Sequence, residues 1–246
     1  MSKFFTNTYS VINIYREMSA KSEVVTQMLY GDSFSVIQKS QNWQKIKIKE
    51  DQYQGYIKNK EFNSYVKPTH KIYKLKAKVY RFPNKKRKIL MLPFGSKLTI
   101  KERKGKFIKF EKGWIHQKDI KLLDFREENI FKKIKLFKNT KYKWGGKSFK
   151  GIDCSGLVQL FLNFNNKPCP RDAKDQIRFF NRNVKLKNIK KNDIIYWEGH
   201  VAIVLSKTKL IHAYGPMKKT VIMDINKTLE LIKNTAKLDF ISIKRV

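Results

Sequence analysis

The sequence has little cysteine and no long apolar run. Its two cysteines, Cys154 and Cys169, are too few for a disulfide framework, so we expect a reduced, cytoplasmic protein. No apolar run approaches the roughly 18 residues that a membrane-spanning helix requires. Residues 1–18 also lack the continuous apolar stretch of a secretory signal peptide. We therefore expect neither a membrane span nor export.

Acidic residues are also scarce. The sequence has only 20 Asp and Glu but 55 Lys and Arg, which gives a net charge of +35. Such an excess suggests an anionic partner, such as a nucleic acid, an anionic wall polymer or a membrane surface. The alternative is that solvated lysines are scattered over every face. Because the aromatic residues are spread through apolar patterns and do not alternate with basic residues, we expect no specific nucleic-acid partner.

The chain is rich in apolar side chains, and its first half contains an internal repeat. Hydrophobic residues make up 41% of the sequence, which excludes a disordered protein. Tyr15 and Tyr80 each precede an arginine and are 65 residues apart, and Gly31 and Gly95 are 64 residues apart. Each copy consists of short alternating apolar runs separated by turn residues, as in a small all-β unit. We predict two compact β-barrels.

We place these barrels at residues 1–66 and 67–124, and a third domain at residues 125–246. The third domain opens with helical apolar spacing over residues 152–164 and continues with four strand patterns, so we predict an α+β domain. The formal charges of the three segments are +3, +15 and +17. The nearly neutral first barrel suggests that its acids serve a purpose.

Cys154 is the candidate nucleophile. It stands at the predicted start of the helix, after Asp153 at the N-cap position, where the helix dipole favours thiolate. Gly151 and Gly156 leave room for a substrate backbone to approach. The alternative is a buried cysteine that only fills space, the role we assign to Cys169.

A nucleophilic cysteine needs a base, and the base needs an orienting partner. His200 and His212 lie on consecutive predicted strands. If residues 206–208 form a three-residue hairpin loop, the two histidines share one face and lie within reach of each other. A two-residue loop would place them on opposite faces. Two satisfied polar side chains on a sheet, or a zinc site with Cys154, are the alternatives.

The motifs YKWGGKSFKGIDCSGLVQLF, PRDAKDQ, KKNDIIYWEGHVAIVL and LIHAYG occur in this order and resemble the NlpC-type cell-wall cysteine peptidases, a papain-like family. The resemblance implies Cys154 as the nucleophile, His200 as the base and His212 as the residue that orients it. It also implies that Tyr142 reaches the active site, and that two residues beside the nucleophile contact the substrate. These two residues are Asp153 and Ser155. The resemblance implies no metal and no cofactor.

Two bacterial SH3-like barrels ahead of such a domain resemble the γ-D-glutamyl-L-diamino acid peptidases. In that subgroup an acid and a tyrosine of the first barrel bind the free amine of an N-terminal L-Ala, and Asp32 and Tyr53 are the best matches here. The expected substrate is a murein tripeptide or a similar small peptide, cut during cell-wall peptide recycling. A catalytically idle wall- or nucleic-acid-binding protein and an acyltransferase of the same fold are the alternatives.

Overall fold

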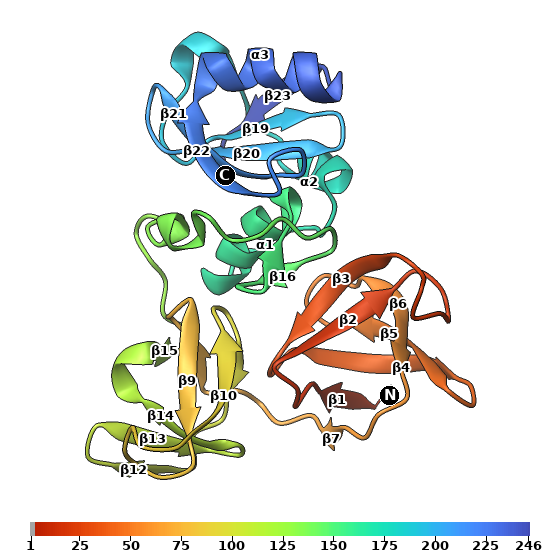
Figure 1. Cartoon of the computed structure of the whole chain (residues 1–246), viewed down its shortest axis with the longest axis vertical. Helices are drawn as coiled ribbons and strands as arrows, with labels where there is room; N and C mark the ends of the chain where they lie inside the picture. The colour runs from red at the N-terminus through yellow and green to blue at the C-terminus, as the bar shows by residue number, and fades with distance from the viewer. Residues whose placement is uncertain (1–2) are drawn as a thin grey trace. The chain divides into compact units, whose positions relative to one another are not determined.

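The computed structural model describes residues 3–246 (Figure 1). The chain forms two compact units that divide between Phe125 and Arg126, and each unit is described by itself. The first unit is built of strands, and the second combines strands with three α-helices. The predicted α+β class is therefore confirmed.

Strands between residues 4 and 64 form one seven-stranded sheet in the order β3-β2-β6-β5-β4-β1-β7. Alternating side chains of its strands point inward, where Ile14, Phe34, Ile46 and Ile57 are fully buried. This alternation arises because successive strand residues face opposite sides of the sheet. The strands are β1 (Phe4–Thr6), β2 (Val11–Tyr15), β3 (Val24–Leu29), β4 (Ser33–Lys39), β5 (Trp43–Ile48), β6 (Gln54–Lys58) and β7 (Asn63–Ser64).

The remaining strands of the first unit repeat this plan. A five-stranded sheet has the order β10-β9-β14-β13-β12, in which β9 and β14 are second and third, as β2 and β6 are in the first sheet, and a separate three-stranded sheet has the order β11-β8-β15. Gly31 and Gly95 have the same φ of +83° in the corresponding turns. The internal repeat is therefore present in the structure. The strands are β8 (His70–Ile72), β9 (Lys76–Tyr80), β10 (Lys88–Pro93), β11 (Lys97–Leu98), β12 (Glu102–Lys104), β13 (Phe107–Phe110), β14 (Gly113–His116) and β15 (Ile120–Leu122).

Side chains of one copy enter the other within this unit. Tyr30 packs with the buried core of the second copy, edge-on to Phe110 at a centroid distance of 5.6 Å. Lys97 extends the other way, and its ammonium pairs with Asp32 at 3.3 Å and with Glu50. Burial by itself lowers the pKa of Lys97, but Glu50 and Asp32 together raise it above its ordinary value. The two copies are thus joined by an aromatic and an ionic contact.

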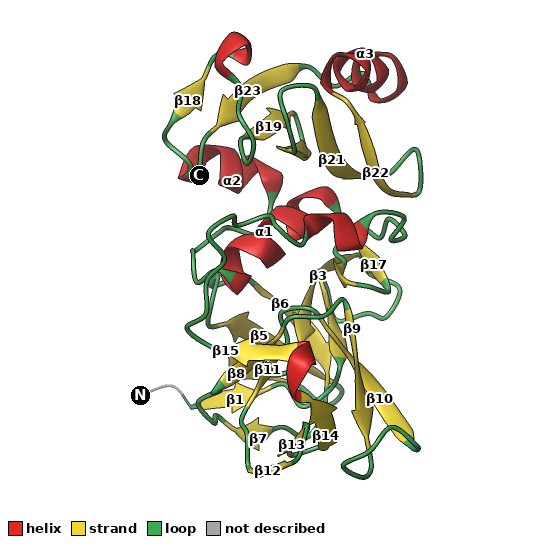
Figure 2. Ribbon diagram, turned by 90° about the vertical axis from the view of Figure 1, so that its left-hand side faces the viewer, coloured by secondary structure: helices red, strands yellow, loops and turns green. Residues whose placement is uncertain are grey.

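The second unit is built on the six-stranded sheet β18-β23-β19-β20-β21-β22. Figures 1 and 2 show α1 and α3 on opposite sides of this sheet. Helix α1 packs against β20 and β21, whereas Ile225 and Ile232 of α3 join a core formed by the other face. The strands are β16 (Lys147–Ser148), β17 (Gly151–Ile152), β18 (Asn183–Val184), β19 (Ile194–Trp197), β20 (His200–Val204), β21 (Lys209–Tyr214), β22 (Lys219–Asp224) and β23 (Phe240–Lys244).

The helices are α1 (Cys154–Phe164), α2 (Ala173–Phe179) and α3 (Ile225–Ala236), with short 3₁₀ turns η1 (Gln117–Asp119), η2 (Ile134–Phe137) and η3 (Leu186–Asn188). The predicted helix and the four-strand meander after it are confirmed. Sequence reasoning missed α2, α3 and β23. Helix α3 starts where the last predicted strand ends, because Asp224 caps it by accepting hydrogen bonds from the backbone N–H groups of Asn226 and Lys227.

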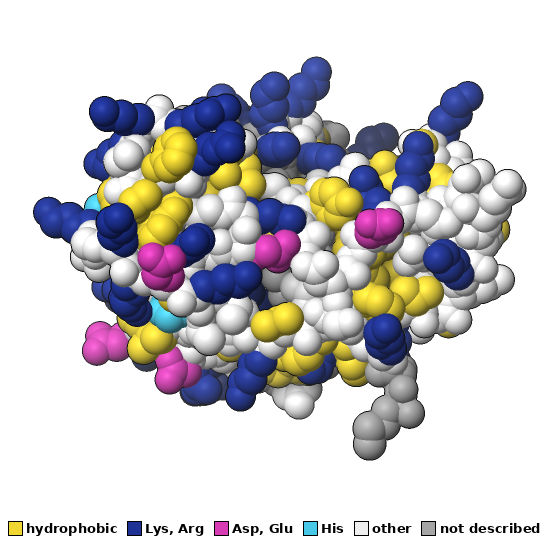
Figure 3. All heavy atoms as spheres, turned by 90° about the horizontal axis from the view of Figure 1, so that it is seen from below, with side chains coloured by type: hydrophobic (Ala, Val, Ile, Leu, Met, Phe, Trp, Pro, Cys, Tyr) yellow, Lys and Arg dark blue, Asp and Glu magenta, His cyan; other side chains and the backbone are white. Residues whose placement is uncertain are grey.

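Charged side chains cover the surface broadly. Figure 3 shows Lys and Arg dispersed among neutral and hydrophobic groups over the face that it presents, with few acids between them. This dispersion favours the interpretation of solvated lysines for that face. No helix within residues 3–246 is long and apolar enough to cross a bilayer.

Gly31→Ala should strongly destabilise the first unit. Besides its positive φ, a Cβ at Gly31 would lie 2.1 Å from the Lys97 carbonyl oxygen. We expect a loss of about 2 kcal/mol or more in urea unfolding. Gly105→Ala is the matched control, since Gly105 has φ +54° but nothing within 4 Å of such a Cβ, and it should cost about 1 kcal/mol. Equal losses in the two variants would show that the close approach at Gly31 does not matter.

Candidate active site

The candidate nucleophile is the first residue of α1. Asp153 is the N-cap, with φ −100° and ψ 178°, and its carboxylate accepts a hydrogen bond of 2.7 Å from the Gly156 backbone N–H. This bond satisfies one of the free N–H groups at the helix start. The helix behind Cys154 is almost wholly buried, so the position of its first turn is fixed by core packing.

The glycines near Cys154 serve a different purpose from the one expected. A Cβ on Gly156 would lie 2.5 Å from the Gly146 carbonyl oxygen, and a Cβ on Gly146 would lie 2.5 Å from that of Gly151. The backbone of Gly146 therefore fills the space at Gly156 that we expected a substrate to use, and the Lys143 side chain fills the space at Gly151, 2.5 Å from such a Cβ. The absence of a side chain at these glycines lets the loop before α1 pack in direct backbone contact with the first turn of the helix.

Arg171 holds this helix start, and sequence reasoning missed its role. Its guanidinium binds both carboxylate oxygens of Asp153, at 2.5 and 3.1 Å, and donates to the Ser155 hydroxyl at 2.9 Å. Arg171 is 2% exposed, so this is a buried, bidentate ion pair. The predicted substrate contacts of Asp153 and Ser155 stay predictions, because the carboxylate and hydroxyl are engaged within the protein. The only sequence signal was the PRDAKDQ motif that contains Arg171.

The two histidines meet as the hairpin argument predicted. Ile203 pairs with Ile211 and Val204 with Leu210, a register that places residue 202 opposite residue 212. His200 Nε2 and His212 Nδ1 are 2.9 Å apart, and both side chains are buried. The predicted loop length and shared face are therefore confirmed.

The geometry of the pair sets the protonation pattern that a base requires. His200 has its Nε2 toward His212, which leaves Nδ1 as the atom that receives a proton from a thiol. For Nδ1 to be the acceptor, Nε2 must carry the hydrogen and donate it to His212 Nδ1. His212 then carries its own hydrogen on Nε2, an atom that is buried and has no partner within residues 3–246.

Aromatic rings hold the histidine pair in place. Tyr214 stacks on His212 with a centroid distance of 5.0 Å and an interplanar angle of 17°. The Tyr214 hydroxyl lies 2.6 Å from the Thr235 hydroxyl on α3. Trp197 lies against His200 at 5.6 Å. The rings are thereby fixed between the sheet and α3.

Cys154 lies beside the strand that carries His200. Backbone N–H groups of Val201 and Ser155 bond to the sulfur and lower its pKa, as does the charge of Arg171. Burial and, to a smaller extent, the Asp153 carboxylate outweigh them and raise the pKa of the thiol to about 12. The expectation that the helix start favours a resting thiolate is therefore wrong. The sulfur keeps its proton until a base removes it.

Burial likewise keeps the two histidines neutral. It lowers the pKa of His200 well below 6.5, and the nearby His212 acts in the same direction. It lowers the pKa of His212 to about 4. A protonated thiol beside a neutral imidazole is the resting state that general-base activation of a nucleophile requires.

Tyr142 lies close to the nucleophile, as the resemblance implied. Its backbone bridges Ile152, two residues before Cys154, and its N–H donates to the Lys218 carbonyl oxygen at 2.8 Å. Burial raises the pKa of the Tyr142 phenol, and the charges of Cys154 and Asp153 add to this effect. The phenol therefore stays protonated and can donate a hydrogen bond. Its contact with substrate stays a prediction.

Asp32 and Tyr53 lie in the first unit. The Asp32 carboxylate is buried and accepts hydrogen bonds from the Leu29 N–H at 2.8 Å and from the Lys97 ammonium at 3.3 Å. Tyr53 is half-buried and packs against the core of the first copy. The binding of a substrate amine by these two residues stays a prediction, and Asp32 already holds an amine of the protein itself.

A metal site was the chemical alternative. Within residues 3–246, no group of three His, Cys, Asp or Glu side chains is arranged to hold a metal ion. The two histidine nitrogens that face each other share a hydrogen bond. This arrangement fits a base that is oriented by a hydrogen bond.

Comparison with known proteins agrees with this geometry. Residues 139–233 match the NlpC/P60 family, and residues 14–62 match the bacterial dipeptidyl-peptidase SH3 domain. The second unit is therefore an NlpC/P60 domain of the cysteine peptidase class, and an SH3 domain precedes it. The SH3-like nature of the second copy and the domain boundaries at residues 66 and 124 stay predictions.

Individual relatives extend the likeness over both units. Dipeptidyl-peptidase 6 of Lysinibacillus sphaericus is 28% identical over 229 residues, which are 82% of this chain and 84% of that protein. The γ-D-glutamyl-L-lysine dipeptidyl-peptidase of Bacillus cereus is 22% identical over 244 residues, covering 83% and 72%. The crystal structure of an NlpC/P60 family protein from Bacillus cereus ATCC 10987 has a TM-score of 0.84 at 19% identity and covers 99% of both chains. This last match shows a shared fold.

Arg171→Met should destabilise the second unit. The change leaves the Asp153 carboxylate buried without its partner, and we expect a loss of about 3–5 kcal/mol in urea unfolding. Arg16→Met is the control, because the exposed Arg16–Glu23 pair should contribute less than about 1 kcal/mol. Comparable losses would mean that the buried pair is not the main support of the helix start.

The pH dependence of kcat/KM should reflect a neutral thiol and a neutral base. Because the pKa of His200 is lowered, its imidazole stays unprotonated in mildly acidic solution, so activity should fall only at a pH well below 6.5. Because the thiol pKa is raised, thiolate absorbance, measured against Cys154→Ala, should stay flat between neutral pH and about pH 9. A thiolate titrating below neutral pH would instead show a resting thiolate–imidazolium pair.

Proposed function

We propose that this protein is a cysteine peptidase that hydrolyses the γ-D-glutamyl-diamino acid bond of murein-derived peptides with a free N-terminal L-Ala, as in cell-wall peptide recycling. The observation that carries the proposal is the buried, hydrogen-bonded His200–His212 pair, together with a Cys154 sulfur at the start of α1 that bonds to the N–H of Val201, the residue after His200. The names of the two relatives, a dipeptidyl-peptidase and a γ-D-glutamyl-L-lysine dipeptidyl-peptidase, support the substrate class.

Acylation begins with proton transfer. His200 Nδ1 takes the Cys154 proton while the sulfur attacks the γ-carbonyl carbon, and His212 Nδ1 accepts the hydrogen bond of the imidazolium that forms. Backbone N–H groups at the start of α1 and the protonated Tyr142 phenol stabilise the negative oxygen. His200 then gives its proton to the departing amine of the diamino acid, and a thioester remains.

Deacylation uses the same residues in the opposite order. His200 Nδ1 removes a proton from water, the oxygen attacks the thioester carbonyl, and the C–S bond breaks. The proton returns to the Cys154 sulfur, and the acid product leaves. Both half-reactions balance without a metal or a redox partner.

Digestion of L-Ala-γ-D-Glu-diaminopimelate and of its lysine analogue tests this function. We expect release of the diamino acid, complete loss of activity in Cys154→Ala and activity within a few-fold of wild type in Cys169→Ala. Acetylation of the N-terminal amine should lower kcat/KM about tenfold or more, because a charge-assisted hydrogen bond is lost. Activity retained in Cys154→Ala, or intact polymeric wall cut as fast as the tripeptide, would contradict the proposal.

Histidine variants separate the base from the residue that orients it. His212→Asn keeps an acceptor for His200 Nε2 and should cost about tenfold or less, whereas His200→Ala should cost about 10²-fold or more. An equal loss in both would assign His212 another role. Transfer of the acyl group to an added amine in preference to water would identify an acyltransferase. Inhibition by a chelator that zinc reverses would identify a metal site.

A further inference from the structure

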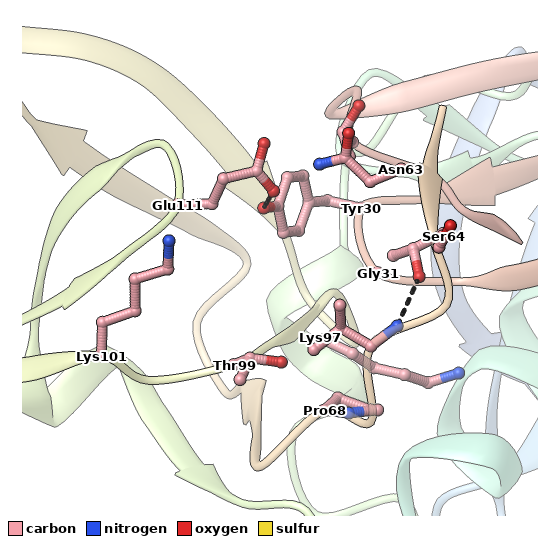
Figure 4. A pocket seen from close by; sticks show the side chains of 12 residues that line it. Tyr30, Gly31, Asn63, Ser64, Pro68, Lys97, Thr99, Lys101 and Glu111 are labelled. Atoms are coloured by element: carbon pink, nitrogen blue, oxygen red, sulfur yellow. Dashed lines mark hydrogen bonds between the residues drawn. The ribbon is translucent and has the colours of Figure 1, made fainter. Parts of the chain in front are cut away.

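A pocket of about 170 Å³ lies within the first unit, where the two copies of the repeat meet (Figure 4). Both copies and the segment that joins them contribute to it. Its walls include Tyr30 and Asn63 from the first copy, Val66 from the joining segment, and Lys101 and Glu111 from the second copy. The NlpC/P60 match and the candidate catalytic residues lie in the other unit.

The walls of this pocket are held in place. The Tyr30 carbonyl oxygen accepts a hydrogen bond of 2.8 Å from the Lys97 N–H, and Gly31 approaches the Lys97 backbone too closely to allow a Cβ. The Ser10 hydroxyl donates to the Met91 carbonyl oxygen at 2.7 Å, a second link between the copies. The pocket is therefore preformed, as small-molecule sites usually are.

Several polar groups around the pocket have no partner of their own. Among residues 3–246, no hydrogen bond or ion pair reaches the side-chain amide of Asn63, the Lys101 ammonium or the side-chain hydroxyls of Thr8 and Ser64. Lys101 is exposed and its side chain points toward Glu111 (Figure 4). Ammonium and amide N–H groups are donors, and together they suit a carboxylate.

Glu111 places a negative charge at the pocket, opposite in sign to the Lys101 ammonium. It accepts a hydrogen bond from the buried Tyr30 hydroxyl at 3.2 Å, and its other oxygen pairs with the Lys112 ammonium at 2.9 Å. Its side chain is 36% exposed, so it has free lone pairs that reach solvent at the pocket. Val66 and Pro68 add an apolar wall.

We propose that this pocket binds a small zwitterion of the amino-acid type, a free amino acid or a dipeptide. Lys101 and Asn63 bind its carboxylate, Glu111 binds its ammonium, and the apolar wall contacts its methyl or methylene groups. A volume of about 170 Å³ accommodates a ligand of that size. This inference does not depend on the proposed peptidase reaction.

Titration calorimetry on full-length Cys154→Ala tests the site without turnover. The probes are L-lysine, L-alanyl-D-glutamate, N-acetyl-L-alanyl-D-glutamate and acetate. We expect at least one of the first two to bind, and Lys101→Met to weaken its binding about tenfold. Lys104→Met is the matched control, since Lys104 is exposed on the neighbouring strand but does not line the pocket, and it should leave binding unchanged.

Glu111→Gln distinguishes a zwitterion site from a simple anion site. The amide keeps an acceptor for the Tyr30 hydroxyl but loses the charge that faces the ligand ammonium. Glu111→Gln should weaken binding of the free dipeptide about tenfold. The acetylated dipeptide should bind more weakly than the free dipeptide to the parent protein, and Glu111→Gln should leave its affinity unchanged. No binding of L-lysine or L-alanyl-D-glutamate up to about 10 mM would overturn the proposal. So would binding that survives Lys101→Met but is lost in Tyr142→Phe, which would place the ligand at the candidate active site.

Discussion

The candidate active site depends on one buried carboxylate. Asp153 caps α1 through the Gly156 N–H and holds Arg171 in a bidentate ion pair, so it fixes both the helix start and the segment after the helix. Burying such a charge is tolerable only because every oxygen is paired. The same carboxylate also raises the pKa of the neighbouring thiol. The residue that positions the nucleophile therefore opposes its ionisation, and a strong, well-oriented base has to compensate.

Burial sets the character of that base. An exposed histidine would be partly protonated near neutral pH, whereas burial lowers the pKa of both His200 and His212 and keeps them ready to accept a proton. Desolvation also strengthens the hydrogen bond that orients His200, because the local dielectric is low. Tyr214 stacks on His212 and is held by Thr235 of α3, so α3 contributes to the geometry of the histidine pair.

Helix-capping preferences and strand alternation, which depend only on residues near each other in the chain, predicted part of this structure from the sequence. The cap at Asp153 and the hairpin register of His200 and His212 follow from spacing along the chain, so they could be read directly. Arg171 could not, because its partner lies 18 residues away and only the folded chain brings them together. The resting state of Cys154 was misjudged for a related reason. The helix dipole is a local effect, but burial is set by the whole domain.

The repeat shows what two acids of the first copy do. At the offset of 64 residues that relates Gly31 to Gly95, Asp32 corresponds to Ser96, so the first copy has a carboxylate where the second has a hydroxyl. That carboxylate and Glu50 receive the Lys97 ammonium of the second copy. Without these acids, the burial of Lys97 would lower its pKa and cost stability. The acids retained by the first copy thus neutralise a cation of the second, and they join the two copies where the pocket lies.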